Sequence, residues 1–187
     1  VPDSFATPNL VDEQIAVATR VILEAAAALP SPPRVFVAAS AEIFGDCGIS
    51  PQDEDAPKRP RSPYGEAKLA AHEAVGRARE ELGLFAVSGI LFNHESPRRP
   101  QRFLPRKVTS GAAAIALGLS DRLVLGSLDA VRDWSHAADL MRGARLALEA
   151  TEPRDYVLAS GVGRTVGDLV DAAFDAAGVP AERRVIE

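Results

Sequence analysis

The stretch Arg34-Val35-Phe36-Val37-Ala38-Ala39 gives the clearest indication of the fold, and Ser40-Ala41-Glu42 follows it directly. The run from Val35 to Ala39 is continuously apolar and lies between prolines at 30–33 and a polar, proline-bearing segment at 46–61. A short apolar run with turn signals on both sides is typical of a strand that is buried on both faces, as in parallel sheets. The sequence therefore predicts a buried parallel strand with polar residues at its carboxyl end.

Helical and extended patterns alternate along the rest of the chain. Apolar residues recur at helical spacing from Leu10 to Leu29, and the prolines that follow end this helix. Further helices are predicted at 62–82, 103–119, 136–149 and 165–178. Further strands are predicted at 84–91, 122–125 and 156–159, with an arginine-rich loop at 93–102. Strands that alternate with helices are typical of βαβ units, so the predicted fold class is α/β with a parallel sheet.

Two of these helices carry start signals that are independent of the apolar pattern. Ser62 precedes Pro63; a serine side chain can cap free backbone amides, and proline suits the first helical position. Thr165 has Asp168 three residues later, which approximates a capping box. Gly83 can adopt the left-handed conformation that ends the helix begun at Pro63. Both helices are therefore predicted from local residues alone.

The composition is that of a globular protein. The 187 residues can bury one sizeable core, and 47% hydrophobic with 25% charged residues is ordinary for such a chain. The formal charge of −5 argues against a general nucleic-acid binder, which would carry a basic surface. Cys47 is the only cysteine, so no intrachain disulfide can form and a reducing compartment is expected. No apolar run reaches about 18 residues, so membrane insertion is not expected and the protein is expected to be cytoplasmic. We expect neither a nucleic-acid partner nor a metal site.

Tyr64 and Lys68 are candidate catalytic residues. Their spacing of four on a predicted helix places both side chains on one face. A phenol ionises at about pH 10 and is a poor base at neutral pH unless a nearby cation stabilises the phenolate. Lys68 is placed to supply that cation. The alternative is a surface Tyr and Lys that are neighbours by chance, because this spacing is common.

Ser40 and Glu42 form a second candidate pair, directly after the predicted buried strand. Ligands of open parallel sheets bind beyond the carboxyl ends of the strands, which is where these two residues fall. A serine hydroxyl can hydrogen-bond a substrate oxygen, and a carboxylate can move a proton. Taken by themselves, they are better explained as a loop serine and a solvated carboxylate.

Ser40, Tyr64 and Lys68 in this order resemble the Ser/Thr-Tyr-Lys set of the extended short-chain dehydrogenase/reductase family. In that family such a helix follows such a strand around a Rossmann-like sheet. The resemblance implies that Tyr64 deprotonates a sugar hydroxyl while a hydride leaves for a nicotinamide. It further implies that Lys68 holds the cofactor ribose and that Ser40 orients the reacting oxygen.

Longer stretches narrow the resemblance to the GDP-mannose 4,6-dehydratase family. They are Pro60-Arg61-Ser62-Pro63-Tyr64-Gly65, then Gly89-Ile90-Leu91-Phe92-Asn93-His94-Glu95-Ser96-Pro97-Arg98-Arg99, and finally Arg132-Asp133-Trp134. The second run is long and unusual, so its resemblance to this family is very specific. A polar loop with Asn, His and two Arg also suits the sugar and phosphates of a nucleotide, because arginine contacts phosphate through two parallel hydrogen bonds. By charge alone, the arginines would be explained as a solvated loop.

This resemblance implies two sets of contacts. For the cofactor NADP they are Tyr64, Lys68, His94 and Arg99. For the substrate GDP-mannose they are Glu42, Asn93, Lys107 and Arg132. Arg106-Lys107 and Arg132 match the positions around the diphosphate. The resemblance assigns Asp133 and Trp134 a structural role, with Trp134 packing.

The resemblance also implies a reaction in which water is lost from the sugar. NADP oxidises C4 transiently, and the C4 ketone acidifies the proton on C5 because the resulting anion is an enolate. Glu42 matches the second acid/base of the family, which takes the C5 proton and helps the C6 hydroxyl to leave as water. A plain dehydrogenase or epimerase needs no carboxylate at this position.

The sequence departs from the family pattern in one main respect. The glycine-rich phosphate loop of the family has no counterpart, because no glycine precedes Gly45. The resemblance therefore implies an internal segment that lacks this loop and the C-terminal end of the family pattern. We expect residues 1–95 to form the C-terminal half of a nucleotide-binding domain. Residues 96–187 are expected to mix elements of a smaller substrate-binding lobe with the last elements of that domain.

Three functions remain open from the sequence. The chain is part of a dehydratase that forms a homodimer or homotetramer; or it is a catalytically incompetent homologue that acts as an interaction subunit; or it is a related sugar-nucleotide reductase or epimerase. Glu42 beside the Asn93-His94-Glu95 stretch argues against the third. A glycine-rich strand–helix turn upstream would distinguish the first from the second.

Overall fold

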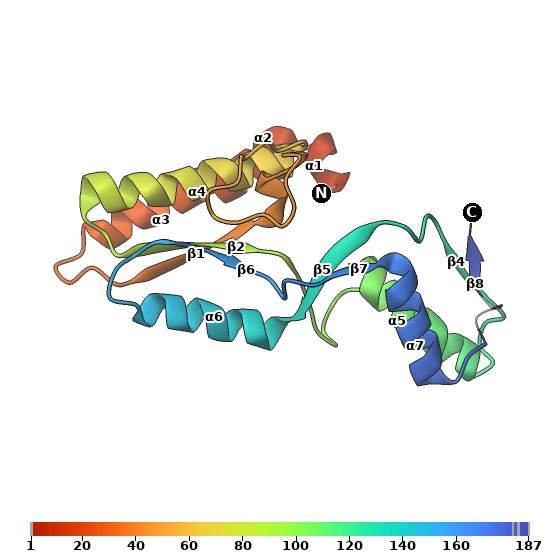
Figure 1. The fold of residues 1–187 in the computed structure, drawn as a ribbon. Helices are drawn as coiled ribbons and strands as arrows, with labels where there is room; N and C mark the ends of the chain where they lie inside the picture. Colours follow the sequence, from red (N-terminus) through yellow and green to blue (C-terminus); the bar gives the residue numbers. More distant parts are fainter. Residues whose placement is uncertain (1, 181, 183, 187) are drawn as a thin grey trace. The chain divides into compact units, whose positions relative to one another are not determined.

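The computed structural model describes residues 2–180, 182 and 184–186. These residues form two compact units (Figure 1). The first unit comprises Val1–Phe92 and Ala138–Ala159, and the second comprises Asn93–Ala137 and Ser160–Glu187. The chain therefore leaves the first unit after its second strand and returns to it for one helix and one strand.

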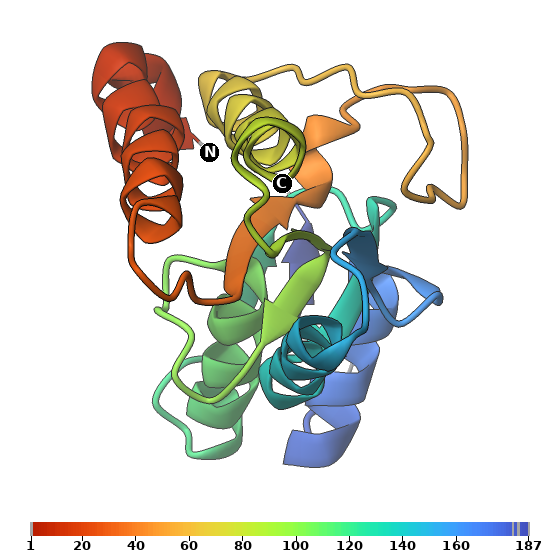
Figure 2. The same cartoon turned by 90° about the vertical axis from the view of Figure 1, so that its left-hand side faces the viewer.

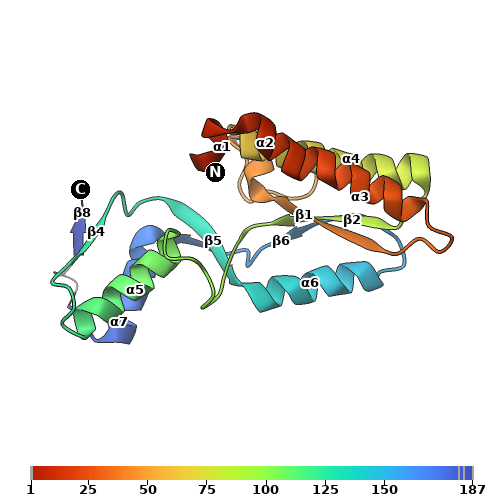
Figure 3. The ribbon, with the colours of Figure 1, turned by 180° about the vertical axis from the view of Figure 1, so that it is seen from behind.

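A parallel sheet forms the centre of the first unit. Its strands are β1 (Val35–Ser40), β2 (Ala86–Leu91) and β6 (Asp155–Leu158), in the order β1-β2-β6. Helices α3 (Ala18–Ala27) and α4 (Pro63–Leu82) cover one face, and α6 (Ala137–Glu149) covers the other (Figures 1 and 3). The central strand β2 is buried along its whole length, as expected for a strand covered on both faces. In β1, at the edge of the described sheet, Ala39 is buried, Ala38 is exposed and the other residues are half-buried, so the burial predicted for this strand is confirmed only in part. The predicted α/β class with a Rossmann-like parallel sheet is confirmed.

The helical layer beside α4 begins near the N-terminus. It runs through α1 (Pro2–Ala6), α2 (Pro8–Asp12) and a π-helical turn, η1 (Glu13–Val17), into α3. In Figure 2, α3 and α4 lie side by side over the sheet. The helix predicted from Leu10 to Leu29 corresponds to the later part of this layer.

Helix α4 has the ends that its sequence predicts. The Ser62 hydroxyl accepts a hydrogen bond from the Gly65 amide, Pro63 is the first helical residue, and Gly83 ends the helix with φ of 62°. On its buried side, Ala74, Val75 and Ala78 pack against Leu23 and the start of the sheet. Local capping and apolar packing therefore place this helix firmly on β1 and β2.

The second unit has its own core and two small sheets. Strands β3 (Asn93–Glu95), β5 (Val131–His136) and β7 (Gly163–Thr165) pair in the order β3-β5-β7, while β4 (Leu123–Leu125) pairs with β8 (Arg184–Ile186). Helices α5 (Leu104–Ala116) and α7 (Val166–Ala177) pack together around Val108, Val170 and Phe174. The capping box predicted at the start of α7 is present.

Asp133 and Trp134 have the structural role predicted for them. The Asp133 carboxylate accepts hydrogen bonds from the amides of Ser160, Gly161 and Val162 at 2.9, 2.7 and 3.2 Å. Trp134 packs against the core of the second unit. Asp133 therefore holds the turn that leads into β7, and Trp134 anchors β5.

The loop predicted at 93–102 is wrong in its first three residues, which form β3. Strands β5 and β7 were not predicted either, and the helix predicted from His136 begins one residue later, at Ala137. These strands are short, polar and partly exposed, so they lack the apolar pattern that identifies a strand from sequence. Among the described residues, no helix is both long and apolar enough to cross a bilayer. The cofactor and substrate roles of the predicted domains stay predictions.

Candidate functional site

The first part of the site lies at the carboxyl end of β1. Ser40 is the last residue of that strand and caps a 3-10 turn, η2 (Ala41–Ile43), with its hydroxyl accepting from the Glu42 amide at 3.2 Å. The cap directs the chain out of the sheet immediately after the strand. Ser40 is half-buried and Glu42 is exposed, as expected for groups that meet a ligand beyond the strand ends.

Gly65 brings Tyr64 to the same place. The first turn of α4 packs so closely on η2 that a Cβ on Gly65 would lie 2.9 Å from the Glu42 carbonyl oxygen. The same Cβ would lie 3.0 Å from the Pro60 side chain. Ser40, Glu42 and Tyr64 therefore belong to two backbone segments in direct contact, although about two dozen residues separate them in sequence.

Lys68 lies one turn further along α4. Its ammonium donates a hydrogen bond to the Ala38 carbonyl oxygen at 2.7 Å and lies 5.8 Å from the centre of the Tyr64 ring. Burial lowers the pKa of Lys68 from its ordinary value, because desolvation disfavours the ammonium. One of its three N–H donors is used by Ala38, so the ammonium keeps donors for a ligand hydroxyl.

Cys47 is buried near this end of the sheet without a visible chemical role. Its sulfur lies 3.6 Å from the Ile49 carbonyl oxygen and 3.9 Å from the Gln52 amide nitrogen. It packs in a core cluster with Ile43 and Phe44. These contacts indicate a small apolar side chain that fills the base of the 46–61 loop.

The remaining candidate residues lie in the second unit. Asn93 and His94 are on β3, opposite Trp134 and Ser135 of β5. Lys107 is exposed on α5, and Arg132 is exposed on β5. A guanidinium nitrogen of Arg132 donates to the carbonyl oxygen of Val131 at 2.7 Å. The side chains of Lys107 and Arg132 are thus open to solvent and able to bind an anion.

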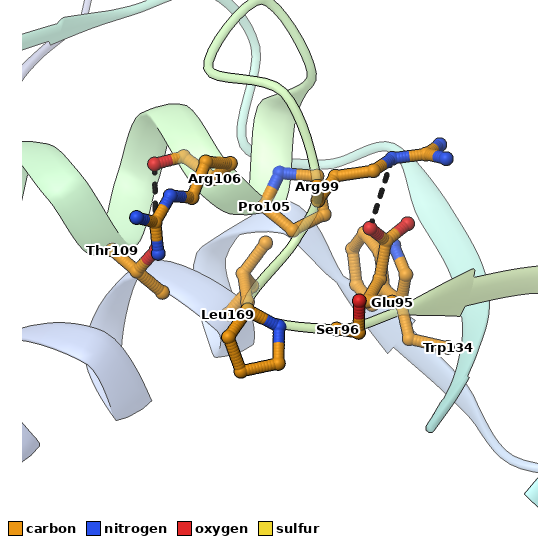
Figure 4. A pocket seen from close by; sticks show the side chains of 9 residues that line it. Glu95, Ser96, Arg99, Pro105, Arg106, Thr109, Trp134 and Leu169 are labelled. Atoms are coloured by element: carbon orange, nitrogen blue, oxygen red, sulfur yellow. Dashed lines mark hydrogen bonds and ion pairs between the residues drawn. The ribbon is translucent and has the colours of Figure 1, made fainter. Parts of the chain in front are cut away.

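Arg99 is held in place beside a pocket. Its Nε atom lies 3.1 Å from a carboxylate oxygen of Glu95 (Figure 4). Its guanidinium stacks on the Phe103 ring, 3.9 Å from the ring centre. The ion pair does not have hydrogen-bond geometry. Burial raises the pKa of Glu95, and the charges of Arg99 and His94 oppose that shift.

The pocket has a volume of about 380 Å³ and a largely apolar wall. It is lined by Glu95, Ser96, Pro97, Arg99, Pro105, Arg106, Thr109, Trp134 and Leu169. Arg99 and Arg106 both contribute to the lining (Figure 4). A planar group with an anionic substituent is the kind of ligand that this combination suits.

The structure therefore brings the predicted residues together in two sets. Ser40, Glu42, Tyr64 and Lys68 gather in the first unit, at the carboxyl end of β1. Asn93, His94, Arg99, Lys107 and Arg132 all belong to the second unit, on and around β3, α5 and β5.

Two residues next to the candidate residues were not singled out from the sequence. Gly65 matters because of the close contact that it permits, which no local pattern reveals. Arg164 is the cross-strand partner of Arg132 in the antiparallel pair of β5 and β7, and both side chains are exposed. Residues directly opposite on such strands share one face, and like charges there destabilise the pair unless an anion neutralises them. Arg164 could not be linked to Arg132 from the sequence, because the two residues are neighbours only through the pairing of β5 with β7.

The parallel sheet and the Ser-Tyr-Lys set at its edge define an α/β protein of the extended short-chain dehydrogenase/reductase class. The sequence profile of the family described as GDP-mannose 4,6 dehydratase matches residues 1–186. The chain belongs to the GDP-mannose 4,6-dehydratase family.

Individual relatives agree with this assignment. The GDP-mannose 4,6-dehydratase of Sinorhizobium fredii (strain HH103) is 44% identical over 181 residues, which cover 96% of this chain and 52% of the relative. The GDP-mannose 4,6 dehydratase of Homo sapiens is 45% identical over 141 residues, covering 75% of this chain and 38% of the relative. The chain thus spans about half the length, or less, of these curated relatives.

The fold agrees with that of solved structures. RMD from Pseudomonas aeruginosa, solved in complex with NADPH, has a TM-score of 0.93 at 24% sequence identity. The match covers 100% of this chain and 64% of that one. At this identity the likeness is one of fold.

Proposed function

We propose that this protein acts as a GDP-mannose 4,6-dehydratase, converting GDP-D-mannose into GDP-4-keto-6-deoxy-D-mannose and water. The observation that carries the proposal is the position of Glu42. It follows Ser40 at the end of β1, and its backbone contacts the helical turn that bears Tyr64. A carboxylate beside a hydroxyl–phenol–ammonium set supplies the second acid/base that loss of water requires.

The residues around Tyr64 fit a nicotinamide cofactor. Lys68 presents a half-buried ammonium with free donors next to Tyr64, which suits a ribose hydroxyl. In the proposal, Tyr64, Lys68, His94 and Arg99 hold NADP, the guanidinium contacting an anionic group of the dinucleotide. When bound, NADP accepts a hydride from the sugar and later returns it.

The chain's own groups then move the protons. Tyr64, as phenolate, takes the proton of the C4 hydroxyl while Ser40 hydrogen-bonds the same oxygen. Glu42 takes the C5 proton once C4 is a ketone, and it returns a proton to the departing C6 hydroxyl, which leaves as water. The C5–C6 double bond that remains takes the hydride at C6 and the proton held by Tyr64 at C5, so the sum is the loss of one water from the sugar with no net oxidation.

The second unit supplies contacts to the sugar nucleotide in this proposal. Asn93 hydrogen-bonds the sugar, and the exposed cations Lys107 and Arg132 neutralise the diphosphate. We further propose a homodimer or homotetramer as the assembled form, as the family resemblance implies.

The test is an assay of the purified protein with GDP-mannose and NADP, with mass spectrometry of the sugar nucleotide. The expected product is lighter by one water. Glu42→Gln should lower its formation by about 100-fold or more, because a general acid/base is worth about that factor. Glu66→Gln is the matched control, since Glu66 is an exposed carboxylate in the first turn of α4. Equal loss in both variants would contradict the role of Glu42.

A protein that is folded, has the mass of these 187 residues and forms no product would contradict activity of this chain by itself. That result would favour the interaction subunit. A product of unchanged mass but altered sugar stereochemistry would instead favour an epimerase.

A further inference from the structure

One face of α4 carries a series of polar contacts to the sheet. Tyr64, Lys68 and His72 are spaced by four residues and therefore share that face. Lys68 binds the Ala38 carbonyl oxygen of β1. His72 contacts Ser88 of β2, and Arg79 binds both the Ala86 carbonyl oxygen and Asp155 of β6, at 3.2 and 2.7 Å. The proposed chemistry uses the first two residues of this face and leaves His72 unexplained.

His72 is buried at the centre of this series. Its exposed fraction is 8%, and that of Ser88 is 0%. Its Nδ1 atom lies 2.8 Å from the Ser88 hydroxyl oxygen, and its Nε2 atom lies 3.8 Å from a carboxylate oxygen of Asp155. A buried polar pair of this kind stabilises only when both members are satisfied, so the Ser88 contact specifies where the helix sits.

The charged groups around His72 come from three elements. Asp155 of β6 and Glu73 of α4 favour the imidazolium, while Arg79 of α4 and Lys58 of the 46–61 loop disfavour it. Strand β2 presents only the uncharged Ser88 hydroxyl. Burial outweighs these charges and lowers the pKa of His72, so the imidazole is neutral in the folded protein at neutral pH.

In the neutral form, the hydrogen bonds have a consistent direction. With the proton on Nε2, facing Asp155, Nδ1 accepts a hydrogen bond from the Ser88 hydroxyl. Protonation of Nδ1 would turn it into a donor and would oblige the buried hydroxyl to find another acceptor. The helix is therefore attached to β2 most securely when His72 is neutral.

The trio of serine, histidine and aspartate is not a nucleophilic site. The Ser88 hydroxyl is fully buried inside β2, so no substrate carbonyl can reach it. A catalytic serine needs an exposed hydroxyl beside an oxyanion site.

We infer that His72 is a positioning residue: its contact with Ser88 fixes α4 on the sheet one turn beyond Lys68 and thereby keeps the Lys68 ammonium beside Tyr64. The inference rests on the proposed roles of Tyr64 and Lys68. It predicts that loss of the His72–Ser88 contact changes the acidity of a phenol two helical turns away. A residue that only stabilised the fold would not have that effect.

The readout is the pH at which Tyr64 ionises, followed by the ultraviolet absorbance of phenolate. The chain has two tyrosines, Tyr64 and Tyr156, so the titration is done in a Tyr156→Phe background. His72→Leu and Ser88→Ala should each raise the midpoint by about one pH unit, which is a tenfold loss of ionisation at a given pH. His72→Gln keeps a side-chain hydrogen-bonding group, so its midpoint should lie close to that of the parent protein.

Val75→Ala is the matched control. Val75 is fully buried on the same helix but makes no polar contact, so the variant should lower the melting temperature and leave the midpoint unchanged. A midpoint shift in Val75→Ala as large as that in His72→Leu would overturn the inference. If His72→Leu does not fold, as judged by circular dichroism, the test uses Ser88→Ala and His72→Gln. A raised midpoint in Ser88→Ala with a near-parent midpoint in His72→Gln would then support the inference, and an unchanged midpoint in Ser88→Ala would overturn it.

Lys68→Met separates this inference from the proposed function. If Lys68→Met raises the midpoint and neither His72→Leu nor Ser88→Ala does, the positioning role is overturned and the Tyr64–Lys68 pair stands. If Lys68→Met leaves the midpoint unchanged, the proposed pairing of Tyr64 with Lys68 is itself contradicted.

Discussion

Gly65 lies directly against the carbonyl oxygen of Glu42, so that a Cβ atom on Gly65 would lie only 2.9 Å from that oxygen. Real Cβ atoms essentially never lie within 3.0 Å of such an atom, so any larger residue at position 65 must push α4 away from η2. Tyr64 is the neighbour of Gly65 on the helix, and Glu42 carries the proposed second acid/base. The contact therefore determines how near the two proposed catalytic groups lie.

Gly65→Ala should disturb this contact. We expect a loss of about 1–3 kcal/mol in the free energy of unfolding from overpacking, and a loss of dehydratase activity larger than the loss of folded protein. Gly76→Ala on the same helix is the control, because its Cβ would have only the end of the Arg79 side chain nearby, at 3.9 Å. That variant should stabilise the protein by about 0.5–1 kcal/mol. Urea unfolding and the mass-spectrometric assay check both, and full activity of Gly65→Ala would contradict the argument.

Ser62→Ala should weaken the start of α4. The Ser62 hydroxyl accepts from the Gly65 amide at 3.1 Å, and the residue is only 6% exposed, so its loss leaves a buried amide without a partner. We expect a loss of about 1 kcal/mol in the free energy of unfolding. Ser62→Thr keeps the hydroxyl and should lose less. If the two variants unfold at the same urea concentration, the cap does not stabilise this helix.

Because of His72, the free energy of unfolding should decrease as the pH is lowered below 6.5. Its folded pKa lies below the unfolded value of 6.5, so the unfolded chain binds more protons in that range. The contribution of neutral His72 is therefore complete above pH 6.5 and is lost as pH falls from there toward the folded pKa. The slope is at most about 1.4 kcal/mol per pH unit.

The measurement is urea unfolding at several pH values for the parent and for His72→Gln. Carboxylates titrate in both proteins, so the difference between the two curves isolates the imidazole. A parent curve that stays parallel to the variant curve below pH 6.5 would show that His72 is not held neutral by the fold.

Arg164→Gln should weaken binding of GDP. Arg164 lies opposite Arg132 on paired strands, and an anion between the two relieves their repulsion. Both side chains are exposed, so we expect a change of about fivefold in Kd, decreasing as salt is added. Calorimetry with GDP measures it, and Arg154→Gln, an exposed arginine of the first unit, is the control. Equal affinities for the two variants would exclude Arg164 from the anion site.

The elements that the sequence predicted well are those with local signals. Helix α4 was predicted from its cap, its proline and its terminal glycine, and α7 from its capping box, because these signals act within a few residues. Strands β1 and β2 were predicted from their short apolar runs, although only β2 is buried along its whole length. Strands β3, β5 and β7 have no such pattern, since their pairing comes from the packing of the second unit.

The α/β class, the Tyr64–Lys68 spacing and, through the stretch around Asn93, the family could all be predicted from the order of the residues. The tertiary structure decided which of these groups meet: Gly65 against Glu42, Lys68 on Ala38, His72 on Ser88 and Arg164 opposite Arg132. The physical reason is the range of the interactions. Capping and periodicity act over a few neighbouring residues and can be read along the chain. Contacts between backbone segments, and the burial that sets the pKa of an imidazole, exist only after distant segments have packed together.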